Sequence, residues 1–179
     1  MIDESKALSA TSVEPIKTSE LQWTGGMNQA FSLGHDAILQ RLCDAFNHSP
    51  FMANNKMHMQ VVNGQIEGHM AMADHLIGNV AFRILHGGVA ATLLDSIGGV
   101  VAMGEIYRRN EGERSEQMKK AGRLATVDMR VDYLSPGRGK WFVARATVLR
   151  MGRKGCTMRM DLHNDEGNHI ATGIASYAY

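Results

Sequence analysis

Two glycines and one carboxylate, at a fixed spacing, are the residues of this chain best suited to do chemistry. The chain reads His86-Gly87-Gly88, and Asp95 follows nine residues after the histidine as the only formally charged side chain over residues 84–104. If the glycines begin a helix, its first N–H groups can stabilise a developing oxyanion. A carboxylate in apolar surroundings is costly unless something uses or satisfies it. The pattern predicts a donor and a base for acyl transfer or hydrolysis; a structural hydrogen bond made by Asp95 is the alternative.

The helix that carries Asp95 is expected to have two unlike faces. At about 100° per residue, one stripe is apolar and should face the core: Ala90, Leu93, Leu94, Ile97 and Val101. The opposite side holds Asp95 among small residues: Gly88, Ala91, Thr92, Gly99 and Ala102. A solvent-facing side would carry Lys and Glu instead, so we expect another backbone to pack closely there, from a second copy of the chain.

The rest of the chain supplies the elements that position this helix. A helix is expected over residues 34–47, ended by Pro50, and Asn63-Gly64 is a hairpin turn between strands 56–62 and 65–72. Residues 74–85 form a loop, the apolar helix runs over 87–104, and residues 105–120 are an exposed, partly helical excursion. Four strands follow as a meander over 123–134, 140–151, 156–164 and 168–177. The pattern predicts an α+β fold, with an antiparallel sheet wrapped around one long central helix.

Length and composition limit the class of protein. The 179 residues, 44% of them hydrophobic and 21% charged, fit one soluble domain over 34–179 with its leading helix, preceded by an N-terminal arm over 1–33. Two cysteines are too few for a disulfide framework, and Cys43 is expected to be buried. The first residues do not resemble a signal peptide, and the apolar helix contains Asp95 and several glycines. We therefore expect a cytoplasmic protein without a membrane span.

Basic residues gather in the C-terminal half. Eleven of the 19 Lys and Arg residues, but two of the 18 acidic residues, lie between Lys119 and Arg159. Such a surface can bind the phosphates of a nucleotide-like group such as coenzyme A, or it can be a set of solvated strand faces. Few aromatic residues lie among these charges and the pI is about 7.9, so nucleic acid is not expected as a partner. The histidine pairs lack zinc spacing, so no metal site is expected.

Several motifs together resemble a known family. The His-Gly-Gly motif with its later Asp, the segments 126–129 and 133–137, and the C-terminal segment 171–177 are similar to hotdog-fold thioesterases of the PaaI-type group. The resemblance covers about residues 50–179. Gly78-Asn79, the segment 130–134 and Leu162-His163-Asn164 look most like the bacterial medium- and long-chain acyl-CoA thioesterase branch. The resemblance implies the hotdog fold and hydrolysis of medium- to long-chain fatty acyl-CoA to free acid and CoA. No cofactor is implied, because CoA is part of the substrate.

The resemblance also implies a role for each residue of the site. The backbone N–H of Gly87 would bind the thioester carbonyl oxygen. Asp95, from the facing subunit, would act as general base on water or as nucleophile, and Thr126 would position the water. Asn79 and His86 would shape the carbonyl pocket. In many members the asparagine lies six residues before the histidine, whereas here the spacing is seven, so the role of Asn79 is left open.

The same resemblance places the active site at the interface of a homodimer, which can pair further into a homotetramer. Gly88 and a basic rim would bind the substrate and its CoA group; the rim candidates are Arg138, Arg150, Arg153 and Lys154. Three alternatives remain open. They are a hotdog-fold hydratase or dehydratase, an aryl-CoA thioesterase, and a non-catalytic acyl-CoA binding module, which would not need Asp95.

Overall fold

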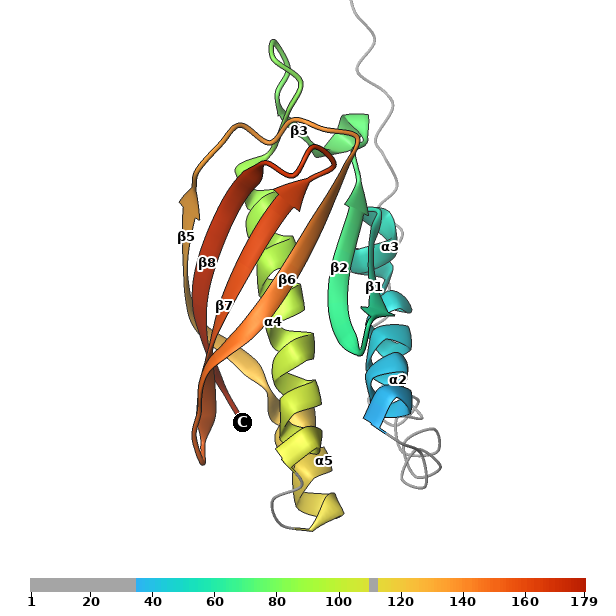
Figure 1. Ribbon diagram of the computed structural model, residues 1–179, viewed down its shortest axis with the longest axis vertical. Helices are drawn as coiled ribbons and strands as arrows, with labels where there is room; N and C mark the ends of the chain where they lie inside the picture. The colour runs from blue at the N-terminus through green and yellow to red at the C-terminus, as the bar shows by residue number, and fades with distance from the viewer. Residues whose placement is uncertain (1–34, 110–112) are drawn as a thin grey trace, which may run out of the picture. The chain divides into compact units, whose positions relative to one another are not determined.

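The computed structural model describes residues 35–109 and 113–179, so the arm expected over 1–33 lies outside the described residues. Within this part the predicted architecture is present, because a six-stranded antiparallel sheet curves around one long helix (Figure 1). That helix, α4, spans Gly87–Arg109. It packs against β2, β5, β6, β7 and β8 of the sheet. The α+β fold with a central helix is therefore confirmed.

The buried face of α4 follows the predicted apolar stripe for most of its length. Ala90, Leu93, Leu94 and Ile97 are at most 2% exposed, whereas Val101 is half-buried. The predicted end at Gly104 is wrong, because α4 continues for five residues more. Gly104 lies inside the helix because it packs on Leu39: a Cβ at Gly104 would lie 3.0 Å from Leu39 Cδ2. By length and composition α4 could cross a membrane, but here it is the core helix of this fold.

The sheet consists of six strands whose bounds lie within a few residues of the predicted ones. They are β1 (Met57–Val62), β2 (Gln65–Ala71), β5 (Ala125–Tyr133), β6 (Trp141–Met151), β7 (Gly155–Asn164) and β8 (His169–Ala178). The strand order is β1-β2-β6-β7-β8-β5.

The predicted four-strand meander is wrong for its first strand, because β5 pairs with β8 and not with β6. The segment 134–140 therefore crosses the end of the sheet from its edge to its middle instead of making a tight turn (Figure 1). β6, β7 and β8 do form a meander.

The smaller elements flank the sheet and the helix. They are α2 (His35–Asn47), α3 (Pro50–Asn54), the 3-10 helix η2 (Asp74–Leu76), β3 (Ile77–Asn79), β4 (Ile84–Leu85) and α5 (Arg114–Arg123). The predicted turn is confirmed, because Asn63 and Gly64 have φ of 51° and 74°, as a two-residue hairpin turn requires. The loop predicted over 74–85 contains the short β3–β4 hairpin. The excursion predicted over 105–120 is less exposed than expected, because Ile106, Tyr107 and Gln117 are buried.

β5 forms one edge of the sheet, and it is an unusual edge. It bonds to β8 on one side, and none of its nine residues is buried in the single protomer, although the strand contains Val127, Met129, Val131 and Tyr133. An exposed strand edge with apolar side chains is a template for pairing with another strand. β5 is therefore the part of the sheet best suited to contact a second copy.

Candidate active site

Asp95 and Thr126, predicted as a pair from the resemblance, lie together in the structure. Asp95 is on the third turn of α4, and Thr126 is near the start of β5. The Thr126 hydroxyl donates a hydrogen bond to Asp95 Oδ1 at 2.9 Å. A bulge in β5 places Val127 between the paired positions Thr126 and Asp128, and Asp128 Oδ1 accepts the Ser176 N–H at 3.1 Å. The bulge thus fixes the register that aims Thr126 at the helix.

A second side chain that sequence reasoning did not single out also reaches Asp95. The hydroxyl of Tyr177, on β8, donates to the Asp95 backbone oxygen at 3.0 Å and lies 3.4 Å from Asp95 Oδ1. Burial, and then the negative charge of Asp95, raises the pKa of Tyr177. The phenol is therefore a hydrogen-bond donor at all working pH values.

At the N-terminus of α4, His86 sets which backbone N–H groups remain available. The Gly88 N–H donates to His86 Nδ1 at 2.9 Å, so Nδ1 is the unprotonated ring nitrogen. Among the hydrogen bonds of the described residues, none uses the Gly87 N–H. Of these two glycine amides, that of Gly87 thus has no hydrogen-bond partner among the described residues, whereas that of Gly88 is already bonded to His86.

The loop before the helix holds His86 by close packing. The His86 N–H donates to the Leu76 backbone oxygen at 2.9 Å. A Cβ at Gly78 would lie 2.7 Å from His86 Cα, so only glycine lets the two backbones approach this closely. Asn79 is exposed, and its Oδ1 accepts the Phe82 N–H at 3.3 Å. In the described protomer Asn79 therefore supports the β3–β4 turn, and no hydrogen bond links it to His86 or Gly87.

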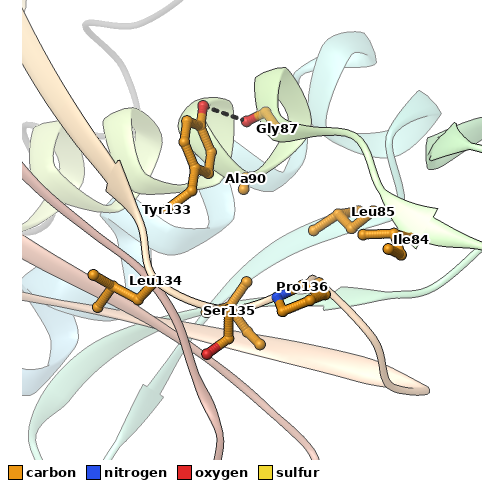
Figure 2. Close-up of a pocket in the computed structure, with 10 residues that line it drawn as sticks. Ile84, Leu85, Gly87, Ala90, Tyr133, Leu134, Ser135 and Pro136 are labelled. Carbon is orange, nitrogen blue, oxygen red and sulfur yellow. Dashed lines mark hydrogen bonds between the residues drawn. The ribbon is translucent and has the colours of Figure 1, made fainter.

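A pocket of about 410 Å³ is lined by Gly87 and by residues around it (Figure 2). Its walls come from β4, the start of α4, the end of β5 and the crossover segment: Ile84, Leu85, Gly87, Ala90, Tyr133, Leu134, Ser135, Pro136, Gly137 and Ile170. The Tyr133 hydroxyl donates to the Gly87 backbone oxygen at 2.9 Å, and a Cβ at Gly87 would lie 3.2 Å from the Tyr133 ring. Tyr133 belongs to the motif that carries the resemblance, but no role was predicted for it from the sequence.

The Gly87 N–H and the Asp95 carboxylate lie too far apart in one protomer to act on the same atom. Gly87 and Asp95 are eight residues apart on α4, which corresponds to roughly 12 Å along the axis. Tyr133 marks the Gly87 end of β5, whereas Thr126 marks the Asp95 end. Each protomer thus carries two half-sites, at opposite ends of one edge strand.

Three of the four predicted rim residues line one pocket, and the fourth lies elsewhere. Arg150, Arg153 and Lys154 surround a cavity of about 380 Å³ at the β6–β7 turn. Tyr179 holds this turn, because its hydroxyl donates to the Gly152 backbone oxygen at 2.7 Å. Arg138 belongs to the crossover segment at the other end of β6, an eleven-residue strand about 35 Å long. Within one protomer Arg138 therefore lies apart from the other three rim candidates.

The chain matches known proteins over its central part. The thioesterase superfamily matches residues 82–171, about half of the chain. The medium/long-chain acyl-CoA thioesterase YigI of Escherichia coli strain K12 is 43% identical over 103 residues, which are 57% of this chain and 66% of YigI. The matched region thus spans just under two thirds of the length of that relative.

Solved structures match over more of the chain. A protein of Shewanella oneidensis related to the thioesterase superfamily is 37% identical, covers 80% of this chain and 96% of its own, and has a TM-score of 0.74. The E. coli PaaI protein from the phenylacetic acid degradation operon covers 81% of this chain and 95% of its own with a TM-score of 0.65; at 14% identity it shows a likeness of fold alone. By its fold and by these comparisons, the chain belongs to the thioesterase superfamily, with the hotdog fold that its motifs predicted.

Proposed function

We propose that this protein is an acyl-CoA thioesterase that hydrolyses medium- to long-chain fatty acyl-CoA to the free acid and CoA. One observation carries the proposal. Among the described residues, the Gly87 N–H at the start of α4 is unused, and the Asp95 carboxylate accepts a hydrogen bond from Thr126. An oxyanion donor and a base are the two groups that thioester hydrolysis needs. The likeness to YigI, named a medium/long-chain acyl-CoA thioesterase, supports the choice of substrate class.

The active site is proposed to form between two protomers. No strand of the described residues pairs with the outer edge of β5, and two copies of β5 can pair antiparallel about their midpoint near Met129. Thr126 lies three residues before this midpoint and Tyr133 four residues after it. Such pairing brings Thr126 and Asp95 of one protomer to the Gly87 end of its partner. A homodimer would then contain two complete sites, which is why the proposal requires a dimer, alone or within a tetramer.

The proposed reaction follows from the chemistry of the two half-sites. The Gly87 N–H of one protomer binds the thioester carbonyl oxygen and stabilises the negative charge that develops there. Asp95 of the partner takes a proton from water as the water oxygen attacks the carbonyl carbon. The tetrahedral intermediate collapses, the C–S bond breaks, and the proton goes to the departing CoA thiolate. Direct attack by the Asp95 carboxylate is the covalent variant of this route.

Two pockets are proposed to hold the two ends of the substrate. The pocket beside Gly87 has mostly aliphatic walls, including Leu85, Leu134 and Ile170, which suits an acyl chain. The cavity at Arg150, Arg153 and Lys154 offers positive charge for the CoA phosphates. We extend the proposal to a cytoplasmic enzyme of fatty acid metabolism that needs no cofactor or metal.

The test is CoA release from a panel of acyl-CoAs of short to long chains, with an aryl-CoA included. Asp95→Asn keeps the shape of the side chain and should lower kcat by about a hundredfold or more. Asp161→Asn is the matched control, because Asp161 pairs with His169 on another strand and should keep wild-type kcat. Turnover that peaks at medium or long chains supports the proposal. Absence of turnover with every thioester contradicts it, and tight acyl-CoA binding in that case would identify a binding module.

A further inference from the structure

We propose that Tyr177 is a positioning residue for Asp95, and that it works with Thr126 to leave Asp95 Oδ2 as the reacting oxygen. The inference rests on the proposed hydrolysis and adds to it a residue from a third element, β8. It starts from one contact: the Tyr177 hydroxyl lies between the Asp95 backbone oxygen, at 3.0 Å, and Asp95 Oδ1, at 3.4 Å.

Both side-chain donors to the carboxylate reach the same oxygen. Thr126 Oγ1 donates to Oδ1 at 2.9 Å, and the Tyr177 hydroxyl faces Oδ1 as the longer arm of a three-centre hydrogen bond. Among the described residues no donor reaches Oδ2. The more basic oxygen of a carboxylate is the one without donors, so Oδ2 is the oxygen left to meet water or the thioester.

The register of the sheet delivers the two donors together. Thr126 on β5 and Tyr177 on β8 are directly paired positions, and the bulge after Thr126 fixes that register. Paired residues on adjacent strands lie about 5 Å apart, so their side chains can converge on one acceptor on the helix. The carboxylate orientation is therefore set by the sheet rather than by α4 alone.

The helix makes room for the phenol at one position. A Cβ at Gly98 would collide with the Tyr177 hydroxyl and lie 3.0 Å from the Tyr177 Cζ. Gly98 is three residues after Asp95, and Tyr177 itself is 2% exposed. Gly99 belongs to the small-residue face of α4 that was expected from the sequence, and a Cβ there would lie 3.7 Å from Tyr177 Cε1, so this tyrosine of the same chain covers part of that face.

The test compares variants that remove or strengthen the phenolic donor. Tyr177→Phe removes only the hydroxyl, and it should lower kcat on the order of tenfold with KM changed less than twofold. The acid limb of the kcat profile should move to higher pH, because the carboxylate form of Asp95 loses a donor. Incorporation of 3-fluorotyrosine at position 177 keeps the ring and makes the hydroxyl a stronger donor, so the acid limb should move to lower pH. This variant also keeps the test valid if the phenylalanine variant fails to fold.

Tyr107→Phe is the matched control, because Tyr107 is also a buried tyrosine but lies on α4, twelve residues after Asp95. It should keep the wild-type kcat and pH profile. If Tyr177 acts only on the Asp95 backbone oxygen, Tyr177→Phe would lower Tm but leave kcat and the acid limb unchanged, and the proposal would be overturned. Absence of turnover in the wild type would instead overturn the proposed hydrolysis itself, so the two failures are distinguishable.

Discussion

At the scale of single residues, Asp95 of the central helix meets two hydroxyl groups, that of Thr126 from β5 and that of Tyr177 from β8. Gly87 and Asp95 could be identified because both lie on one helix whose period is known, and Thr126 through the motif that carries the resemblance. Tyr177 could not be given a role, because it lies 82 residues after Asp95 and meets it only through the β5–β8 register. Gly98 leaves room for the Tyr177 side chain, so its role could not be predicted from the sequence either.

The hydrogen bond from Thr126 to Asp95 gives the first residue-scale prediction. Thr126→Val keeps the shape of the side chain but removes the donor, and kcat should fall on the order of tenfold because a hydrogen bond to a charged group is lost. Thr126→Ser keeps the hydroxyl and should retain most of the activity. Steady-state rates at saturating acyl-CoA measure both. Activity that is retained in Thr126→Val but lost in Thr126→Ser would mean that the methyl group, not the hydroxyl, matters.

At the scale of elements, strands and turns were predicted better than their connections. Alternation and the Asn63-Gly64 turn are local signals, and the strands they predict are present. Local periodicity predicts a strand but not which other strand it pairs with. The pairing of β5 with β8 was therefore not predicted, and the crossover over 134–140 was mistaken for a turn. Gly104 was mistaken for a helix end. A glycine is present there because Leu39 of another helix packs closely against it, and this contact is not visible in the local sequence.

The packing of Gly78 against His86 gives an element-scale prediction. Gly78→Ala would place a Cβ 2.7 Å from the His86 backbone, so the β3–β4 hairpin or the start of α4 must move. We expect a lower Tm and a kcat reduced at least tenfold, because the oxyanion donor moves with the helix start. Gly122→Ala in α5 is the control: its Cβ meets nothing within 4 Å, so stability should rise by about 0.5–1 kcal/mol. Thermal melts and initial rates decide the comparison.

At the scale of the whole molecule, the structure separates parts that the sequence placed on one rim. The cavity at Arg150, Arg153 and Lys154 lies at the β6–β7 turn, and Arg138 lies at the other end of β6. The count of charges along the chain shows that one half is basic. It does not show which basic side chains come together in space, because that depends on how the strands pair. Which of these charges meet one CoA group therefore depends on the assembled molecule.

The basic cavity gives a prediction about the CoA group. Arg153→Gln combined with Lys154→Gln should raise KM for acyl-CoA several-fold, and the effect should shrink as salt is added. The same acyl group on pantetheine, which lacks the nucleotide, should show no change in KM. Arg159→Gln on β7, outside the cavity, is the control. If the double variant impairs the pantetheine ester equally, the cavity does not bind the nucleotide.

The cysteines give a prediction about pH and thiol reagents. Burial raises the pKa of Cys43 to about 11 and that of Cys156 to about 11. Both values lie above the ordinary 9.0, so the folded protein holds the thiol protons more tightly than the unfolded chain does. The contribution of the two protonated thiols to the free energy of unfolding is therefore full below about pH 9 and is lost as the pH rises through 11. Iodoacetamide at pH 8 should leave both thiols unmodified by mass spectrometry and activity unchanged. Rapid alkylation of the folded protein would contradict the burial of these thiols.

The most direct measurement of the central claim is a mixing experiment between two inactive variants. Asp95→Asn lacks the carboxylate, and Gly87→Val disturbs the oxyanion end, because a side chain there meets the Tyr133 ring at 3.2 Å. If each site takes Gly87 from one protomer and Asp95 from its partner, a mixed dimer contains one intact site. Refolding an equal mixture should then restore about a quarter of wild-type activity, as expected for random pairing into symmetric dimers. A mixture as inactive as its two components would show that the half-sites do not combine across a dimer.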